Sequence, residues 1–354
     1  MPPKNILVIR FSAMGDVMLL VPVLKSLTHA YPEVTITVVT RPRFMAFFAS
    51  IPGVKVFGAD VDKSYRGLSG MYVLAREILR LGTFELVFDL HDHLRTMLLR
   101  SFLRMSGKRV LVFKKGRGEK KEFVRKHNKV IRKLPHTVDR YREVFVRAGY
   151  DFDILPGPYV SGASEAKKSL NVWLESMGIV PKRKKWIGIA PFANHLSKIW
   201  PGEYTEQLIT LLAQKASLHF FFFGGGKEEV EFFEMVRSRF PDRCTCVAGA
   251  LKIEEEIALL NHIDLMVCVD SSNMHLTVLA GTPLLALWGG THPDVGFGPW
   301  QYDPSVILQI SREELPCRPC SVYGKETCLR KDFACLYRLT PELVEREILR
   351  RLAI

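Results

Sequence analysis

The sequence of 354 residues has no uninterrupted apolar run of about 18 residues, the length that a transmembrane helix needs. Its start also lacks the long apolar core of a signal peptide, because the short strand-like run Ile6–Ile9 ends at Arg10. Low-complexity segments and short repeats are missing too, which excludes disordered, collagen-like and solenoid proteins. These absences predict a globular, cytoplasmic protein, and the length favours two domains.

Two common phosphate-binding motifs are also missing. The sequence contains neither GxGxxG nor a Walker A motif, which argues against a dinucleotide fingerprint and against a P-loop ATPase. Any nucleotide site in this chain must therefore be built from other loops.

Short apolar runs alternate with amphipathic segments in both halves of the chain, which predicts α/β domains with parallel sheets covered on both faces. The expected strands are 6–9, 35–40, 86–90, 110–113, 186–190, 218–223, 264–269 and 284–287. The expected helices are 17–30, 72–81, 203–216, 228–239, 253–261, 273–280 and 341–352.

Turn residues gather at 154–164, which places a domain boundary near residue 160. We therefore expect a first domain over 1–160, a second over 161–338, and a C-terminal segment over 339–354 whose helix packs back on the first domain. Two such doubly wound domains form a cleft, and folds of this kind bind ligands at the carboxyl ends of their strands.

The loop after the first strand, 10–16, contains glycine and leads into a helix. Such a loop brings backbone N–H groups and a helix N-terminus to an anionic group. Asp16 has two interpretations that do not exclude each other. It caps the helix, or it is a carboxylate at the mouth of the cleft that takes a proton from a substrate hydroxyl.

In the second half of the chain, four loops that follow expected strands carry residues suited to binding phosphate. Lys198 follows Ser197 in the first of them and suits a phosphate, although an exposed loop lysine is the alternative. The second, 224–229, has three glycines before Glu228 and Glu229, and one of these acids is expected either to bind ribose or to interact with the helix dipole. The remaining loops are 270–275 and 288–293.

In their order and spacing, the segments 9–16, 197–201, 270–275 and 287–293 resemble glycosyltransferase family 9, the lipopolysaccharide heptosyltransferase family. The resemblance spans the chain from Ile6 to about Tyr337. It implies a GT-B fold, in which two Rossmann-like domains face each other across a cleft. It also implies inverting, metal-independent transfer of a sugar from a nucleotide-diphospho-sugar, by default ADP-heptose, to a lipopolysaccharide core or similar glycolipid at the inner membrane face.

The resemblance implies catalytic roles for Asp16, as general base, and for Lys198, which neutralises the leaving diphosphate. The implied donor-binding residues are Gly15, Ser197, Glu228, Glu229, Asp270, Ser271, Ser272, Asn273, His275, Gly290 and Thr291. One position departs from the family pattern: Ser272 stands where the Asp-(Ser/Thr)-Gly motif has glycine.

The positive charge of the chain is concentrated in one segment. Residues 95–147 hold 18 Lys and Arg but four acidic residues, whereas the whole chain has a net charge of +13. A localised basic segment indicates an anionic partner, and a solvated face is the alternative. We expect docking of an anionic membrane surface or an acceptor phosphate by Lys114, Lys115, Arg117, Lys120, Lys121 and Arg125. Nucleic acid is not expected, because no RNA- or DNA-binding signature accompanies the segment.

Four of the seven cysteines lie close together, at Cys317, Cys320, Cys328 and Cys335. The first two have the spacing of metal ligands, so the four predict a structural zinc ion that takes no part in catalysis. Free thiols or redox pairs are the alternative. Two other functions also remain open at this point: another GT-B enzyme such as a nucleotide-sugar epimerase, and a non-catalytic protein that binds anionic surfaces.

Overall fold

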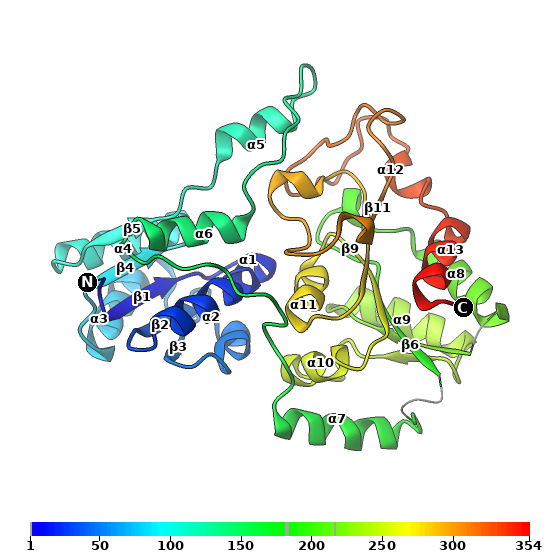
Figure 1. The fold of residues 1–354 in the computed structure, drawn as a ribbon, viewed down its shortest axis with the longest axis horizontal. Coiled ribbons are helices and arrows are strands. Elements are labelled where there is room, and N and C mark those ends of the chain that lie inside the picture. The colour runs from blue at the N-terminus through cyan, green and yellow to red at the C-terminus, as the bar shows by residue number, and fades with distance from the viewer. Residues whose placement is uncertain (1, 181–183, 216) are drawn as a thin grey trace. The chain divides into compact units, whose positions relative to one another are not determined.

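The computed structural model describes residues 2–180, 184–215 and 217–354. Contacts divide the chain into two compact units. Unit 1 contains the chain up to Arg117 together with Pro135–Tyr159, and unit 2 contains Gly118–Leu134 and Val160–Ile354. Each unit is an α/β layer structure with its own sheet (Figure 1).

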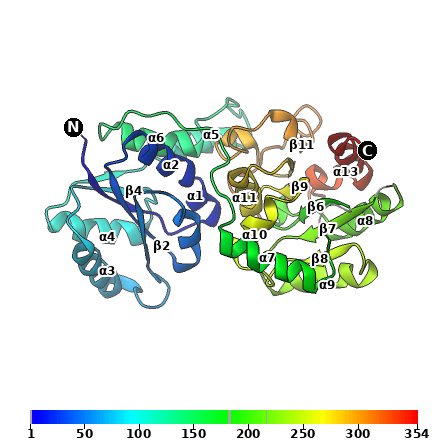
Figure 2. The same ribbon diagram turned by 60° about the horizontal axis from the view of Figure 1, so that its bottom comes forward.

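Unit 1 is built on a parallel sheet in the order β3-β2-β1-β4-β5. Its strands are β1 (Asn5–Ile9), β2 (Thr35–Thr40), β3 (Val54–Gly58), β4 (Leu86–Asp89) and β5 (Val110–Val112). The helices α3 (Gly67–Leu81) and α4 (Leu94–Met105) cover one face, and α2 (Val21–Ala30) and α6 (Thr137–Val146) lie on the other (Figure 2). The apolar residues of α3 recur at helical spacing and enter the core beside Leu99 and Leu103 of α4.

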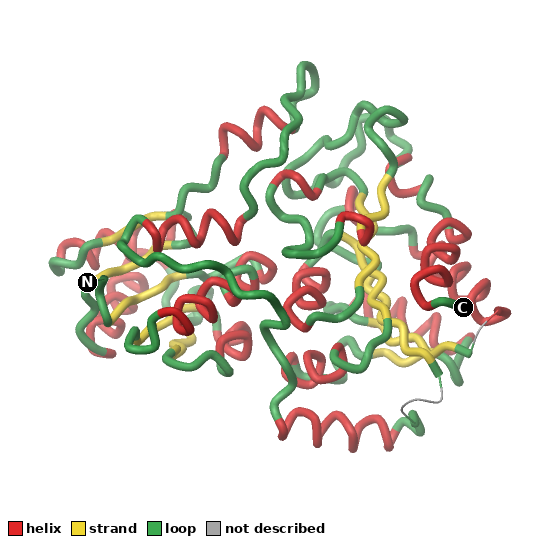
Figure 3. Tube along the Cα trace, viewed as in Figure 1, coloured by secondary structure: helices red, strands yellow, loops and turns green. Residues whose placement is uncertain are grey.

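Unit 2 has a parallel sheet in the order β11-β10-β9-β6-β7-β8, visible as the yellow strands in Figure 3. Its strands are β6 (Lys185–Ala190), β7 (Leu218–Phe222), β8 (Cys244–Cys246), β9 (Leu265–Val269), β10 (Leu284–Trp288) and β11 (Ile307–Gln309). Its longer helices are α7 (Ser164–Ser176), α8 (Gly202–Lys215), α9 (Lys227–Arg239), α10 (Ile253–Leu260), α11 (Ser272–Ala280) and α13 (Pro341–Leu352). The strands β7 and β9 are wholly buried, and β6 is buried except for its first residue, Lys185, as continuous apolar runs in a covered parallel sheet should be.

The topology of each sheet defines where a ligand site is expected. In unit 1 the chain order reverses between β1 and β4, and in unit 2 it reverses between β6 and β9. At such a switch point the loops after the two strands diverge to opposite faces and leave a crevice at the carboxyl ends. The loops that follow these four strands therefore decide the chemistry of each unit.

The α/β class with two parallel sheets is confirmed, but several details differ from expectation. The helix α13 packs against α8 in unit 2, so the prediction that it packs back on the first domain is wrong. Its buried Val344 and Ile348 complete the apolar core over that sheet. The expected helix 17–30 is interrupted: α1 (Met14–Met18) ends before α2 begins. Ala216, expected to end a helix, lies outside the described residues.

The basic segment is divided between the units, whereas the sequence placed all of it in the first domain. Residues 118–134 belong to unit 2, because Phe123 and Leu134 form a small apolar core with Val295. The helix α5 (Arg117–Phe123) therefore begins where the chain leaves unit 1.

Candidate functional site

The switch point of unit 2 carries a buried ion pair. Lys198 ends a short 3-10 turn after β6, and Asp270 directly follows β9. The Lys198 Nζ lies 3.0 Å from Asp270 Oδ2, and the side chains are 14% and 8% exposed. The Thr291 hydroxyl, from the loop after β10, donates to the same carboxylate at 2.7 Å. Three of the sequence-predicted residues thus meet at one point.

The loop that carries Lys198 is held by backbone contacts. Ser197 N donates to Lys325 O at 3.0 Å, and its side-chain hydroxyl accepts from Lys325 N at 2.8 Å. The Ser197 carbonyl accepts from Gly290 N at 2.8 Å. A Cβ on Gly289 would lie 2.5 Å from that carbonyl, so only glycine fits there. Ser197, predicted to bind the donor, uses its hydroxyl to position the loop.

The helix α11 begins beside Asp270 and presents its free end there. Ser271 is the N-cap residue but its side chain makes no cap, and its hydroxyl has no hydrogen-bond partner among the described residues. Ser272 and Asn273 form the first turn, in which backbone N–H groups have no intrahelical acceptor. His275 lies one turn in and is buried. The arrangement offers N–H and hydroxyl donors to an anion.

The sequence left open whether Glu228 or Glu229 is the acid of the glycine loop, and the two residues have different surroundings in the structure. The carboxylate of Glu229 accepts from Gly225 N at 2.8 Å, and burial raises its pKa. A Cβ on Gly224 would meet that carboxylate at 2.4 Å. Glu228 is exposed at the same helix start. Glu229 is therefore the acid that the loop positions.

The switch point of unit 1 carries a second, partly buried ion pair. Arg10 Nη2 lies 2.5 Å from Asp16 Oδ2, and Arg10 Nη1 donates to Leu90 O at 2.5 Å. Burial alone would lower the pKa of Arg10, but Asp16 and Tyr141 outweigh burial and raise it. Asp16 is not the helix cap, because α1 begins at Met14, two residues before it, with Ala13 as the N-cap. The carboxylate remains 24% exposed and available to a substrate.

His91 belongs to the loop after β4 and lies near this pair. Its Nε2 is 3.2 Å from the Ser12 hydroxyl, its ring stacks on His93, and its Nδ1 has no partner among the described residues. Burial and the nearby Arg10 lower the pKa of His91 to about 2. The imidazole is therefore neutral. Sequence reasoning missed both Arg10 and His91, although Arg10 stands directly at the end of the first strand.

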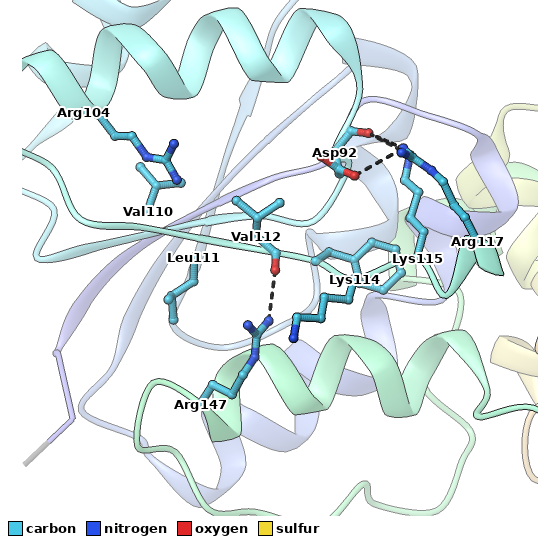
Figure 4. A pocket seen from close by; sticks show the side chains of 10 residues that line it. Asp92, Arg104, Val110, Leu111, Val112, Lys114, Lys115, Arg117 and Arg147 are labelled. Atoms are coloured by element: carbon cyan, nitrogen blue, oxygen red, sulfur yellow. Dashed lines mark hydrogen bonds and ion pairs between the residues drawn. The ribbon is translucent and has the colours of Figure 1, made fainter. Parts of the chain in front are cut away.

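A cation-lined cavity of about 510 Å³ lies beside β5 in unit 1 (Figure 4). It is lined by Asp92, Arg104, Val110, Leu111, Val112, Phe113, Lys114, Lys115, Arg117 and Arg147. Burial and the neighbouring Arg10 and Arg117 lower the pKa of Lys115. Asp92 accepts from Arg117, whereas no salt bridge joins the side chains of Arg104 and Lys114 to an acidic residue among those described. The cavity therefore has an excess of positive charge.

The six cations predicted to dock an acceptor phosphate or a membrane surface are split between the two units. Lys114, Lys115 and Arg117 line the cavity. Lys120 lies in unit 2 and is 4% exposed, with its Nζ 4.0 Å from the centre of the Phe297 ring. This enclosed side chain does not fit the predicted docking of Lys120 on a membrane surface or an acceptor phosphate. Lys121 and Arg125 also lie in unit 2, where Arg125 forms an ion pair with Glu122 on the same segment.

The four clustered cysteines do not form the predicted zinc site. Among the described residues, which include all four, no group of three or more His, Cys, Asp or Glu side chains could hold a metal ion. The thiols have other surroundings. Cys335 lies in the apolar core, where burial raises its pKa to about 12, and Cys320 Sγ is 3.5 Å from Gly290 O.

Comparison with known proteins connects this geometry to a family. The protein-family model described as glycosyltransferase family 9 (heptosyltransferase) matches residues 72–326 of the sequence. The chain belongs to glycosyltransferase family 9. A lipopolysaccharide core heptosyltransferase, OpsX, of Haemophilus influenzae is 22% identical and is aligned over 82% of this chain and 80% of its own. Lipopolysaccharide heptosyltransferase 3 of Escherichia coli is 24% identical over 86% and 88% of the two chains.

Solved structures of the family share the fold. A family 9 glycosyltransferase from Veillonella parvula has a TM-score of 0.76 at 21% identity and covers 99% of this chain and 97% of its own. Heptosyltransferase II of E. coli has a TM-score of 0.68 at 19% identity, with 99% and 98% covered. The expected GT-B class, with two Rossmann-like units, is thereby confirmed, and the chain is a glycosyltransferase. The epimerase and the non-catalytic alternatives are not favoured.

Within the part of the chain that the structure describes, no helix has both the length and the apolar character that crossing a membrane requires.

Proposed function

We propose that this family 9 enzyme transfers heptose from ADP-heptose to a lipopolysaccharide core or similar glycolipid, with inversion and without a metal ion, at the cytoplasmic face of the inner membrane. The observation that carries the proposal is the convergence of Lys198, Asp270 and Thr291 at the switch point of unit 2, beside the free N-terminus of α11. The named relatives act on lipopolysaccharide by their descriptions.

Unit 2 supplies the chemistry of a donor site. The first-turn N–H groups of α11 and the unpaired Ser271 hydroxyl are suited to diphosphate oxygens. Lys198 adds a cation that neutralises the charge developing on the diphosphate as it leaves. Glu229, held at the glycine loop, is the candidate partner for ribose hydroxyls.

Unit 1 supplies the chemistry of an acceptor site. The partly exposed Asp16 carboxylate takes the proton of the acceptor hydroxyl while that oxygen attacks the anomeric carbon of the sugar. The bond from this carbon to the diphosphate oxygen breaks on the opposite face, which inverts the configuration and releases ADP. Arg10 fixes the carboxylate, and the cations of the β5 cavity suit a phosphate on the acceptor.

A panel of nucleotides tests the donor half of this proposal. Thermal unfolding is measured with ADP, UDP and GDP, because a ligand at 100 times its dissociation constant adds about 2.7 kcal/mol to stability. We expect a shift with ADP that is lost in Lys198→Ala and kept in Lys185→Ala, a control that removes an exposed ion pair with Asp264 in the same unit. A shift with UDP or GDP alone contradicts the proposed donor, and no shift with any nucleotide contradicts the site.

Transfer assays test the acceptor half. With ADP-heptose and a deacylated lipopolysaccharide core, Asp16→Asn should lose nearly all turnover and still show the ADP-induced thermal shift. Turnover that survives this change would show that Asp16 is not the base.

A further inference from the structure

The helix α4 of unit 1 is apolar on both of its faces. Its inner face places Leu99 and Leu103 in the core against the sheet. Its outer face carries Leu94, Met97, Leu98 and Met105, and Leu94 and Met105 are 71% and 74% exposed. A surface helix normally turns charged and polar residues outward. Four large apolar side chains on one outer face therefore indicate a partner that covers them.

The exposed side chains of α4 lie on one stripe, which we call the α4 face and define by Leu94, Met97, Leu98 and Met105. Residues four apart on a helix are neighbours, so Leu94 and Leu98 stand next to each other. The neighbouring helix α3 continues the surface, because its exposed Tyr72 contacts Phe102 of α4 with ring centres 5.5 Å apart. Both helices lie on the same side of the unit 1 sheet (Figure 2).

Positive charge surrounds this apolar stripe. The sequence of α4 contains Arg95, Arg100 and Arg104 and no acidic residue. Arg100 turns inward to Asp89, and Arg95 pairs with Asp62, whereas Arg104 is exposed. The exposed cations Arg76 of α3 and Arg109, just beyond α4, add to the charge. The partner must therefore present an apolar layer beneath a negatively charged one.

We propose that the α4 face docks unit 1 on a bilayer that contains anionic lipids, with the apolar side chains among the acyl chains and the arginines at the headgroups. An interfacial helix binds by this combination of buried apolar area and cations. The charge argues against a second copy of the chain as the occupant, because the same positive face would oppose itself. The proposal moves the membrane contact from Lys120 and its neighbours to α4.

This docking rests on the proposed function only in that a glycolipid acceptor is held in a membrane. Arg104 lines the β5 cavity and also stands on α4 beside the α4 face, so the cavity would lie close to the headgroups of a docked bilayer. An acceptor phosphate could then reach the cavity without leaving the membrane.

Co-sedimentation with vesicles tests the proposal. The full chain is mixed with vesicles of phosphatidylcholine containing phosphatidylglycerol, or of phosphatidylcholine alone. We expect binding to the anionic vesicles that weakens severalfold without phosphatidylglycerol and with added salt. The double variant Leu94→Ser/Leu98→Ser should bind about tenfold more weakly or worse, since each leucine loses an apolar contact with the acyl chains.

A matched control uses another helix. The double variant Val172→Ser/Met177→Ser removes two exposed apolar side chains, one within α7 and one at its C-cap, and should bind vesicles as the unchanged protein does. An unaltered melting temperature and ADP-induced shift would show that the α4 variant is folded, and they test the donor site separately from docking. Equal vesicle binding by the α4 variant, or none by the unchanged protein, would overturn the proposal. So would a dimer in sedimentation equilibrium that the α4 variant dissociates.

Discussion

Replacing Lys198 by methionine separates what this residue does for stability from what it does for the donor. The change leaves the buried Asp270 carboxylate with the Thr291 hydroxyl as its remaining side-chain partner. Removing one member of a buried ion pair costs roughly 3–5 kcal/mol, because the other charge stays buried and uncompensated. Lys198→Met should therefore lower the free energy of unfolding of unit 2 by about that amount.

A second substitution recovers stability and leaves the binding defect. In Lys198→Met/Asp270→Asn the uncompensated charge is gone, so most of the lost stability should return. The affinity for ADP should stay low in both variants, because a charge-assisted hydrogen bond to phosphate contributes about 1.5–3 kcal/mol, or roughly 10- to 100-fold. Adenosine, which has no phosphate, should bind the unchanged protein and both variants alike.

The chain offers a clean probe for this experiment. All five tryptophans, Trp173, Trp186, Trp200, Trp288 and Trp300, lie in unit 2, so tryptophan fluorescence in urea follows the unfolding of that unit alone. ADP and adenosine affinities are measured by calorimetry on the same samples. The reasoning is refuted if the double variant Lys198→Met/Asp270→Asn recovers ADP affinity together with stability. Lys198 would then act only as a structural partner of Asp270.

Two further predictions concern single side chains. His91 is neutral in the fold with a pKa lowered to about 2, whereas the unfolded chain binds its proton below about 6.5, so stability is lost as the pH falls. Between pH 7 and pH 5 the free energy of unfolding should fall by about 2 kcal/mol because of this proton. Hydrogen exchange of the β4 amides should show the loss in the unchanged protein and not in His91→Asn. An equal loss in both proteins would rule out His91 as the cause. In the glycine loop, Glu229→Gln should weaken ADP binding severalfold in calorimetry and Glu228→Gln should not, and the reverse order would assign the ribose to Glu228.

Periodicity predicted the layers of the fold because buried parallel strands are continuous apolar runs. It missed β3, whose residues are only partly buried, and it missed α4, whose apolar residues face both inward and outward and so give no one-sided pattern. The packing of α13 was predicted wrongly, because its amphipathic sequence specifies that one face is buried and does not specify which surface buries it.

The sequence predicted which loops form the candidate site, but it did not predict which side chains pair with one another there. Lys198, Asp270 and Thr291 each follow a different strand, so their meeting depends on the strand order, in which β6 and β9 are neighbours. The zinc prediction failed for a related reason. Four cysteines at ligand spacing predict a site only if their side chains form a group that can hold a metal ion, and among the described residues they form none.

The number of cations in the basic segment overstates how many of them are available to an anionic partner. Within 95–147, Arg100 pairs with the buried carboxylate of Asp89, Lys120 packs on an aromatic ring, and Arg104 and Lys114 line a cavity without an acidic partner of their own. Within this segment, a cation beside a carboxylate has part of its charge compensated and so adds less to the attraction for a distant anion. The electrostatic attraction of unit 1 for an anionic acceptor therefore comes mainly from cations such as Arg104 and Lys114, and removal of these side chains should change the salt dependence of acceptor binding.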